Sequence, residues 1–210
     1  AVFSLALMRI ISVPLGILSA VDQDGIADYL IRMLSFVGIS MPGFWLGLLL
    51  IYFVCLKLNL LPVMNSGTDI RTMILPATTL AVSMSAKYTR QGRTAVLEEL
   101  NQDYVIGARA RGIKYPMILV KHVLPNAMLP LITMLGLSFG SLLGGTSVVE
   151  VIFSYPGLGN LAVSAVTTRD YPMIQGFVLW ISMIYMLVNL IVDISYNLID
   201  PRMREGGGKA

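Results

Sequence analysis

Five long apolar stretches separated by polar loops are the feature that most constrains the fold of this chain. They lie at residues 1–20, 33–56, 73–86, 127–149 and 173–192, and the third becomes polar beyond Ala86. A helix needs ~20 predominantly apolar residues to cross the ~30 Å hydrocarbon core of a bilayer. We therefore expect an all-α fold, a polytopic membrane helix bundle with five transmembrane helices.

Composition excludes several other classes of protein. Of the 210 residues, 56% are hydrophobic and 13% are charged, and the mean hydropathy is +0.76. Soluble domains carry about 25% charged residues, so a soluble domain, a disordered chain and a secreted disulfide scaffold are all excluded. Too few residues remain outside the apolar stretches for a large catalytic domain.

The loop charges predict an orientation. Seven of the 15 Lys and Arg residues fall in the loop at 87–122, and the C-terminal tail carries three more. By the positive-inside rule both segments are cytoplasmic, and the sparsely basic loops at 57–72 and 150–172 lie outside. This places residue 1 outside and predicts a multi-pass protein with a cytoplasmic C-terminus. The loop at 21–32 is more acidic than basic and does not support this orientation by itself.

Two apolar stretches carry glycines at a spacing of four. The glycines are Gly43, Gly47, Gly136, Gly140 and Gly144. Such stripes let another helix approach closely. They are compatible with packing inside one bundle, and also with a close subunit contact or a moving gate.

The basic loop contains a segment, residues 101–121, that reads as two short amphipathic helices forming an elbow. The first helix is expected to end at Gly112, a residue suited to the left-handed cap position. The second is expected to start at Pro116, because proline is tolerated in a first helical turn. The residues favour equally a knob that docks in a groove of a soluble partner and a helix pair that lies on anionic lipid.

This segment resembles the cytoplasmic EAA loop of ABC importer permeases. The resemblance rests on Ala108, Gly112, Leu124 and Pro125, and residues 103–112 are most similar to the dipeptide/oligopeptide/nickel branch. Three positions depart from the general motif, which has Glu, Ala and Ile where this chain has Ile106, Gly107 and His122. The branch commonly departs in the same way.

Further motifs extend the resemblance to residues 13–202. They are the entry to a span at 40–45, an external loop at 150–159, and the short segments 169–172 and 200–202. The resemblance implies a permease domain at 1–200 and a flexible cytoplasmic tail at 201–210. Because the family usually has six spans, it also implies that the first span and an external domain are missing from this chain.

The resemblance implies that the loop at about 98–123 couples the permease to an ATP-hydrolysing subunit. The expected docking residues are Asp103, Tyr104, Ala108, Arg109, Arg111 and Gly112. The expected partners are a second homologous permease, two ATP-binding subunits, an extracytoplasmic substrate-binding protein and membrane lipid, with no nucleic acid. The expected location is the bacterial cytoplasmic (inner) membrane.

The implied function is that of a pore subunit importing small peptides or nickel, free or chelated, by alternating access. No acid/base or nucleophile pair is placed for catalysis, and residues 206–209 lack the Ser/Thr and following helix of a phosphate loop. We therefore expect no catalytic residue, cofactor or metal in this chain, with ATP and Mg bound by partner subunits.

Two alternatives and one external site stay open. The first alternative is a self-sufficient secondary transporter, which needs charged residues deep in the membrane, and Arg9 is the only plausible one. The second alternative is a non-transport membrane scaffold that recruits a soluble partner. Glu150, Tyr155, Pro156 and Gly157 are candidates for an external gate or receptor contact. The interpretation of Glu150 as a local cap or an ion-pair member is favoured over the external contact.

Overall fold

The fold is helical throughout the part that the computed structural model describes, residues 2–62 and 70–199. The elements are α1 (Val2–Val21), α2 (Ile26–Ser40), α3 (Gly43–Leu50), the π-helical η1 (Ile51–Lys57), α4 (Ile70–Leu100), α5 (Asp103–Ala110), α6 (Tyr115–Ile118), the π-helical η2 (Leu119–Val123), α7 (Leu124–Gly145), α8 (Ser147–Ile152), α9 (Leu158–Thr168) and α10 (Tyr171–Ile199). The expected all-α fold is confirmed, and the tail at 201–210 lies outside the described residues.

Fewer than five helices are long and apolar enough to cross a membrane. In the described residues three helical stretches qualify, namely Val2–Val21, Tyr115–Gly140 and Tyr171–Ser195. A fourth is gained if the bent pair Ile26–Ser40 and Gly43–Lys57 counts as one broken span. The second and third of the five predicted stretches therefore differ from simple spans, each for its own reason.

The second predicted span is broken at Pro42. Proline lacks an N–H and pushes the residue before it into extended backbone, and Met41 accordingly adopts φ −88° and ψ 125°. The helices on the two sides are bent by 99°. Helix α2 also begins at Ile26, seven residues before the predicted start of this span, so it includes Asp28 and Arg32.

The third predicted span is the apolar first half of a longer helix. Helix α4 is 31 residues long and continues without a break through Arg90 and Arg93 to Leu100. Its polar second half is the reason that the helix as a whole does not qualify as an apolar span. One rigid element therefore extends from the apolar stretch into the basic loop.

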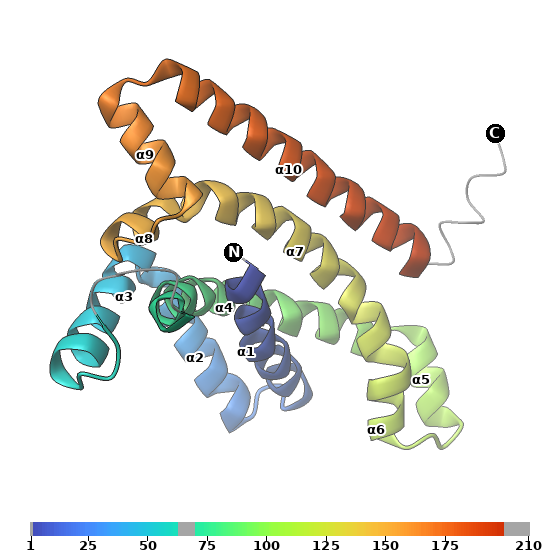
Figure 1. The fold of residues 1–210 in the computed structure, drawn as a ribbon. Helices are drawn as coiled ribbons and strands as arrows, with labels where there is room; N and C mark the ends of the chain where they lie inside the picture. Colours follow the sequence, from blue (N-terminus) through green and yellow to red (C-terminus); the bar gives the residue numbers. More distant parts are fainter. Residues whose placement is uncertain (1, 63–69, 200–210) are drawn as a thin grey trace, which may run out of the picture.

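Helix α4 is the element against which most others pack (Figure 1). Its most extensive neighbour is α1, and α2, α3, α7 and α8 also contact it. The α1–α4 crossing is close because of Gly16. A Cβ atom at Gly16 would lie 3.0 Å from the carbonyl oxygen of Thr89 and 3.2 Å from the backbone nitrogen of Arg93.

Two apolar clusters mark opposite ends of the bundle. One joins Ala20 at the end of α1 and Val96 of α4 to Val105, Ile118 and Val123 of the elbow. We call this the elbow end.

The other cluster joins Cys55 of η1 and Leu75 near the start of α4 to Val149 and Phe153. We call this the far end. The end of α1 and the elbow, both next to segments predicted to be cytoplasmic, lie together at the elbow end.

Helix α10 lies outside this packed core. It returns along α7 and contacts α7 and α9 (Figure 1). None of its apolar stretch Tyr171–Ser195 is buried within the chain. A large apolar surface is therefore available to lipid or to another protein.

We predict that Gly16→Val destabilises the chain by about 1–3 kcal/mol, the usual cost of overpacking, because the new side chain would push α1 away from the α4 backbone. The measurement is thermal unfolding of the chain in detergent. Gly176→Val is the matched control, since a Cβ at Gly176 meets nothing within 4 Å. Equal melting temperatures for the two variants would contradict the close crossing.

Candidate functional site

The elbow is closed by a left-handed glycine. Gly112 has a φ of +75°, which disfavours any residue with a Cβ. The N–H of Ile113 donates to the carbonyl of Ala108 at 3.2 Å, and the N–H of Gly112 donates to that of Arg109 at 2.9 Å. This pair of bonds is the Schellman motif that ends a helix. The predicted end of the first elbow helix at Gly112 is confirmed, and the second begins at Tyr115, one residue before Pro116.

The inner face of α5 holds the elbow together. Val105 is completely buried and Ala108 is 2% exposed, and both belong to the apolar cluster with Ile118 and Val123. The small side chain of Ala108 thus allows close packing inside the elbow, and its predicted contact with a partner stays a prediction.

Tyr104 also acts inside the chain. Its hydroxyl donates to the Glu99 carboxylate at 2.6 Å and accepts from the side-chain amide of Asn126 at 3.3 Å. These bonds join the end of α4, the start of α5 and the first turn of α7. The geometry thus makes Tyr104 a clamp for the elbow.

The outer face of the elbow is basic and apolar. Asp103, Arg109, Arg111 and Gly112 are all exposed there. The Arg109 guanidinium lies over the Tyr115 ring, 5.4 Å from its centroid. A stacked arginine of this kind is held in place yet keeps its donors free for another group.

Three further apolar side chains of the elbow are exposed and were not predicted from the sequence. They are Ile106, Met117 and Val120, each about half exposed or more. The helical spacing could have predicted the exposure of Ile106. Val105 and Ala108 are three residues apart and share the buried face of α5, so Ile106 falls on another face of this helix. We call Ile106, Arg109, Arg111, Met117 and Val120 the elbow face.

A buried ion pair at the elbow end was not predicted. Asp28 has no exposed surface, and both its oxygens accept bonds from the Arg93 guanidinium at 2.7 Å. The Ser19 hydroxyl and the Asp24 backbone N–H also donate to it. One carboxylate therefore ties α1, the α1–α2 turn, α2 and α4 together, in the bidentate geometry that arginine favours.

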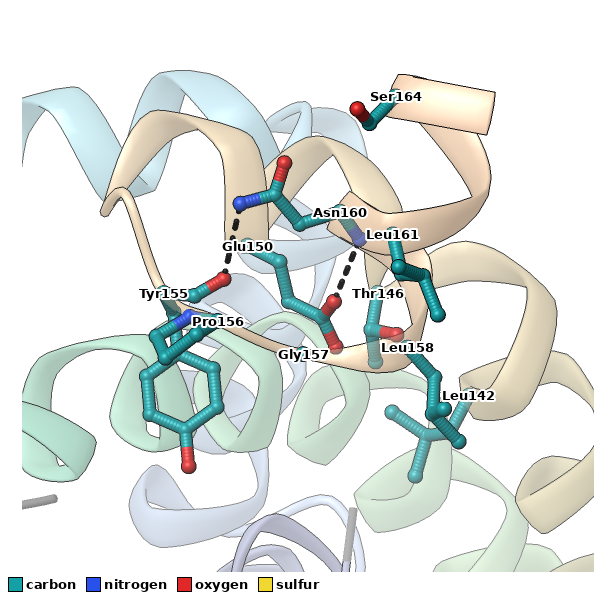
Figure 2. Close-up of a pocket in the computed structure, with 10 residues that line it drawn as sticks. All are labelled: Leu142, Thr146, Glu150, Tyr155, Pro156, Gly157, Leu158, Asn160, Leu161 and Ser164. Atoms are coloured by element: carbon teal, nitrogen blue, oxygen red, sulfur yellow. Dashed lines mark hydrogen bonds between the residues drawn. The ribbon is translucent and has the colours of Figure 1, made fainter. Parts of the chain in front are cut away.

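At the far end, Glu150 caps a helix (Figure 2). Its carboxylate accepts the backbone N–H of Asn160 at 2.9 Å, in the first turn of α9. A Cβ at Gly157 or Gly159 would collide with this carboxylate. A negative charge at a helix N-terminus is stabilising, so within the chain Glu150 has the local role of a cap.

The capped turn borders an open pocket of about 710 Å³. Tyr155, Pro156, Gly157 and Glu150 line it together with residues of α7 and α9 (Figure 2). The Asn160 side-chain amide donates to the Tyr155 carbonyl at 3.1 Å and fixes the turn. The turn with Tyr155, Pro156 and Gly157 and the carboxylate of Glu150 in α8 are therefore brought together around one pocket.

The glycine stripes face other helices of the same chain. Gly43 faces Ser83 of α4, and Gly47 faces Thr79 of α4 and Phe153. Gly136 and Gly140 of α7 face Val192 and Tyr185 of α10, and a methyl group at either would collide with that side chain. The surroundings of Gly144 lie outside what the structure describes.

Comparison with known proteins places this helix bundle among membrane permeases. The model of the family described as "Binding-protein-dependent transport system inner membrane component" matches residues 12–205. The chain belongs to this family, and it is a multi-pass membrane protein.

Curated relatives carry names of peptide permeases. The chain is 41% identical to the glutathione transport system permease protein GsiC of Pectobacterium atrosepticum, over 97% of this chain and 66% of that protein. It is 43% identical to the oligopeptide transport system permease protein AppB of Bacillus subtilis, over 95% and 65% respectively. It is 38% identical to the probable D,D-dipeptide transport system permease protein DdpB of Escherichia coli, over 98% and 69%. The chain thus spans about two thirds of the length of these relatives.

Solved structures share the fold. An inward-facing crystal form of the MetNI methionine ABC transporter matches with a TM-score of 0.75 at 18% identity, covering 94% of this chain and 89% of that one. A chain of an amino acid ABC transporter matches with a TM-score of 0.68 at 18% identity, covering 92% and 88%. The bundle is therefore a fold found in ABC transporters.

We predict that Gly112→Val loosens the elbow, because an L residue in the left-handed region costs about 1–2 kcal/mol. Hydrogen exchange should rise across residues 101–123, where the Schellman bonds would weaken. Gly107→Val is the matched control, because Gly107 is helical and a Cβ there meets nothing within 4 Å. Unchanged exchange in the Gly112 variant would show that the turn tolerates a side chain.

We predict that Asp28→Asn lowers the free energy of unfolding by about 3–5 kcal/mol, since it leaves the Arg93 charge largely buried without its partner. Asp24→Asn is the control and should change little, because the Asp24 side chain is 75% exposed. The double variant Asp28→Asn/Arg93→Gln should be more stable than Asp28→Asn alone. A double variant that is less stable than the single one would contradict the pairing.

Proposed function

We propose that this chain is the pore-forming subunit of an ATP-driven importer and that the elbow face is its contact with an ATP-hydrolysing subunit. The observation that carries the proposal is the elbow itself. A short helix pair is packed on the end of α4 and presents Arg109, Arg111 and exposed apolar side chains beyond the bundle. Family membership supports the same conclusion.

The chemistry of the elbow face suits a protein groove. Ile106, Met117 and Val120 supply apolar anchors of the kind that dominate interface energies. Arg109 and Arg111 supply forked donors that match partner carboxylates. The inner cluster and the Tyr104 clamp keep these groups in fixed positions, which lowers the entropy lost on binding.

The rigidity of α4 suits the transmission of motion. The elbow is fixed to one end of α4, and the start of α4 packs beside α8 at the far end. A movement imposed on the elbow face would therefore reach the far end through one helix. We propose that this is how ATP-driven closure of the ATPase subunits changes access to the pore.

The substrate class that we propose is small peptides. Its support is the names of the relatives, which refer to glutathione, D,D-dipeptide and oligopeptide transport. Nickel, free or chelated, is the second candidate and rests on the motif resemblance alone. The chain would share the choice of substrate with an extracytoplasmic binding protein.

Hydrolysis and cofactor binding are assigned to other subunits. We propose two ATP-binding subunits that hold ATP and Mg, and a second homologous permease that completes the pore. Among the described residues there is no group of three or more His, Cys, Asp and Glu side chains that could hold a metal ion. We assign no catalytic role to any residue of this chain.

The proposed orientation has the elbow and the C-terminus in the cytoplasm and the far end outside. The turn formed by Tyr155, Pro156 and Gly157 would then face the binding protein. Glu150 would support this surface by fixing α9 beneath it. The apolar surface of α10 would be divided between the second permease and lipid.

We expect Arg111→Glu to abolish co-purification of the ATP-binding subunits, because it reverses a charge on the elbow face while the inner cluster stays intact. The measurement is affinity purification of the assembled complex from membranes, with insertion checked by the yield of permease. Arg169→Glu is the matched control, since Arg169 is exposed at the opposite end of the bundle. Normal recovery of ATPase subunits by the Arg111 variant would contradict the proposed contact.

The same purified material tests the alternatives. Ion-gradient-driven uptake by the permease without any ATPase subunit would favour a secondary transporter. A bound ATPase that substrate and binding protein do not stimulate would favour a scaffold. The proposed importer requires stimulated ATPase activity and no uptake by the permease alone.

A further inference from the structure

A pocket between α2 and α4 combines basic and apolar side chains at the elbow end. Its volume is about 370 Å³, and its lining includes Arg32, Arg90 and Arg93 together with Phe36 and Ile39. We call it the α2–α4 pocket. Neither the elbow contact nor the far end uses it.

The pocket holds more positive than negative charge. Asp28 is already occupied by the bidentate bonds of Arg93, and Arg32 approaches it only at 3.5 Å. The other carboxylate near Arg32 is Asp24, at 3.8 Å. No described carboxylate pairs with Arg90, which is exposed. The Arg32 and Arg90 guanidiniums therefore keep donors available for an anion.

The arrangement along α2 separates charge from apolar surface. Arg32, Phe36 and Ile39 are spaced by four and three residues and lie on one face of the helix. Arg32 is nearer the elbow end, and Phe36 and Ile39 follow toward the break at Pro42. Phe36 is 71% exposed and Ile39 is 43% exposed. An occupant would thus meet cations at its end nearer the elbow and apolar side chains along the rest of its length.

We propose that the α2–α4 pocket binds an anionic phospholipid. Its phosphate would accept hydrogen bonds from Arg32 and Arg90, and one acyl chain would lie along Phe36 and Ile39. Basic pockets between helices near a membrane surface are suited to such headgroups. In the orientation proposed above the lipid comes from the inner leaflet. The site does not require transport activity, so it can fail while the importer assignment stands.

The lipid site is tested by native mass spectrometry of the full chain released from detergent. The probes are dioleoyl phosphatidylglycerol and dioleoyl phosphatidylethanolamine at equal concentration. We expect the wild-type chain to retain phosphatidylglycerol preferentially. The double variant Arg32→Gln/Arg90→Gln should bind it roughly thirtyfold more weakly, because two near-surface cations are lost.

The matched control is Lys114→Gln/Lys121→Gln, which removes two exposed charges outside the pocket. It should bind phosphatidylglycerol like the wild type. Equal losses in both double variants, equal retention of the two lipids by the wild type, or displacement of the lipid by inorganic phosphate would each overturn the proposal.

A second variant keeps the test independent of charge effects on folding. Phe36→Ala preserves all three arginines and the Asp28–Arg93 pair. It should weaken binding of the dioleoyl lipid and leave binding of a short-chain phosphatidylglycerol unchanged. Wild-type affinity for the dioleoyl lipid in this variant would contradict the predicted path of the acyl chain.

Discussion

The buried pairing of Asp28 with Arg93 is the interaction on which the elbow end depends. A carboxylate with no exposed surface is stable there because a guanidinium, a hydroxyl and a backbone N–H all donate to it. Removing either charge would leave the other unpaired in a site of low dielectric constant. The pair therefore fixes α2 against α4, while Gly16 allows α1 to lie directly on the α4 backbone close by.

With α1 and α2 fixed, α4 acts as the common support of the chain. The elbow is attached to the polar end of α4. Its inner face packs through apolar side chains, and the Tyr104 hydroxyl donates to the Glu99 carboxylate at the end of α4. The apolar start of α4 lies beside η1 and α8, close to the turn that Glu150 holds. The two regions with proposed roles are thus joined by one unbroken helix, which is what a device that transmits motion requires.

Local patterns in the sequence predicted the apolar helices and the elbow, because these depend on composition and on single residues. Gly112 is the clearest case, since only the left-handed position explains a glycine at the end of a basic helix. Local patterns did not predict the contacts that residues make with distant parts of the chain. Ala108 is buried because α5 packs against α6 within the elbow cluster. Asp28 is paired with a residue 65 positions away. The break at Pro42 shows the same limit. A proline inside an apolar stretch predicts that the helix bends or begins there. The size of the bend, 99°, accompanies the packing of α3 on α4 and α8, which the local sequence does not reveal.

The central claim is that the elbow face contacts an ATP-hydrolysing subunit, and site-specific photocrosslinking in native membranes tests it most directly. A photoreactive amino acid placed at Ile106 should form one dominant crosslink, to the nucleotide-binding subunit, because this side chain is exposed at the centre of α5. The same amino acid at Val163 on α9, also exposed, should give no such product. A crosslink from Ile106 only to lipid, or ATPase crosslinks from Val163 and not from Ile106, would contradict the account.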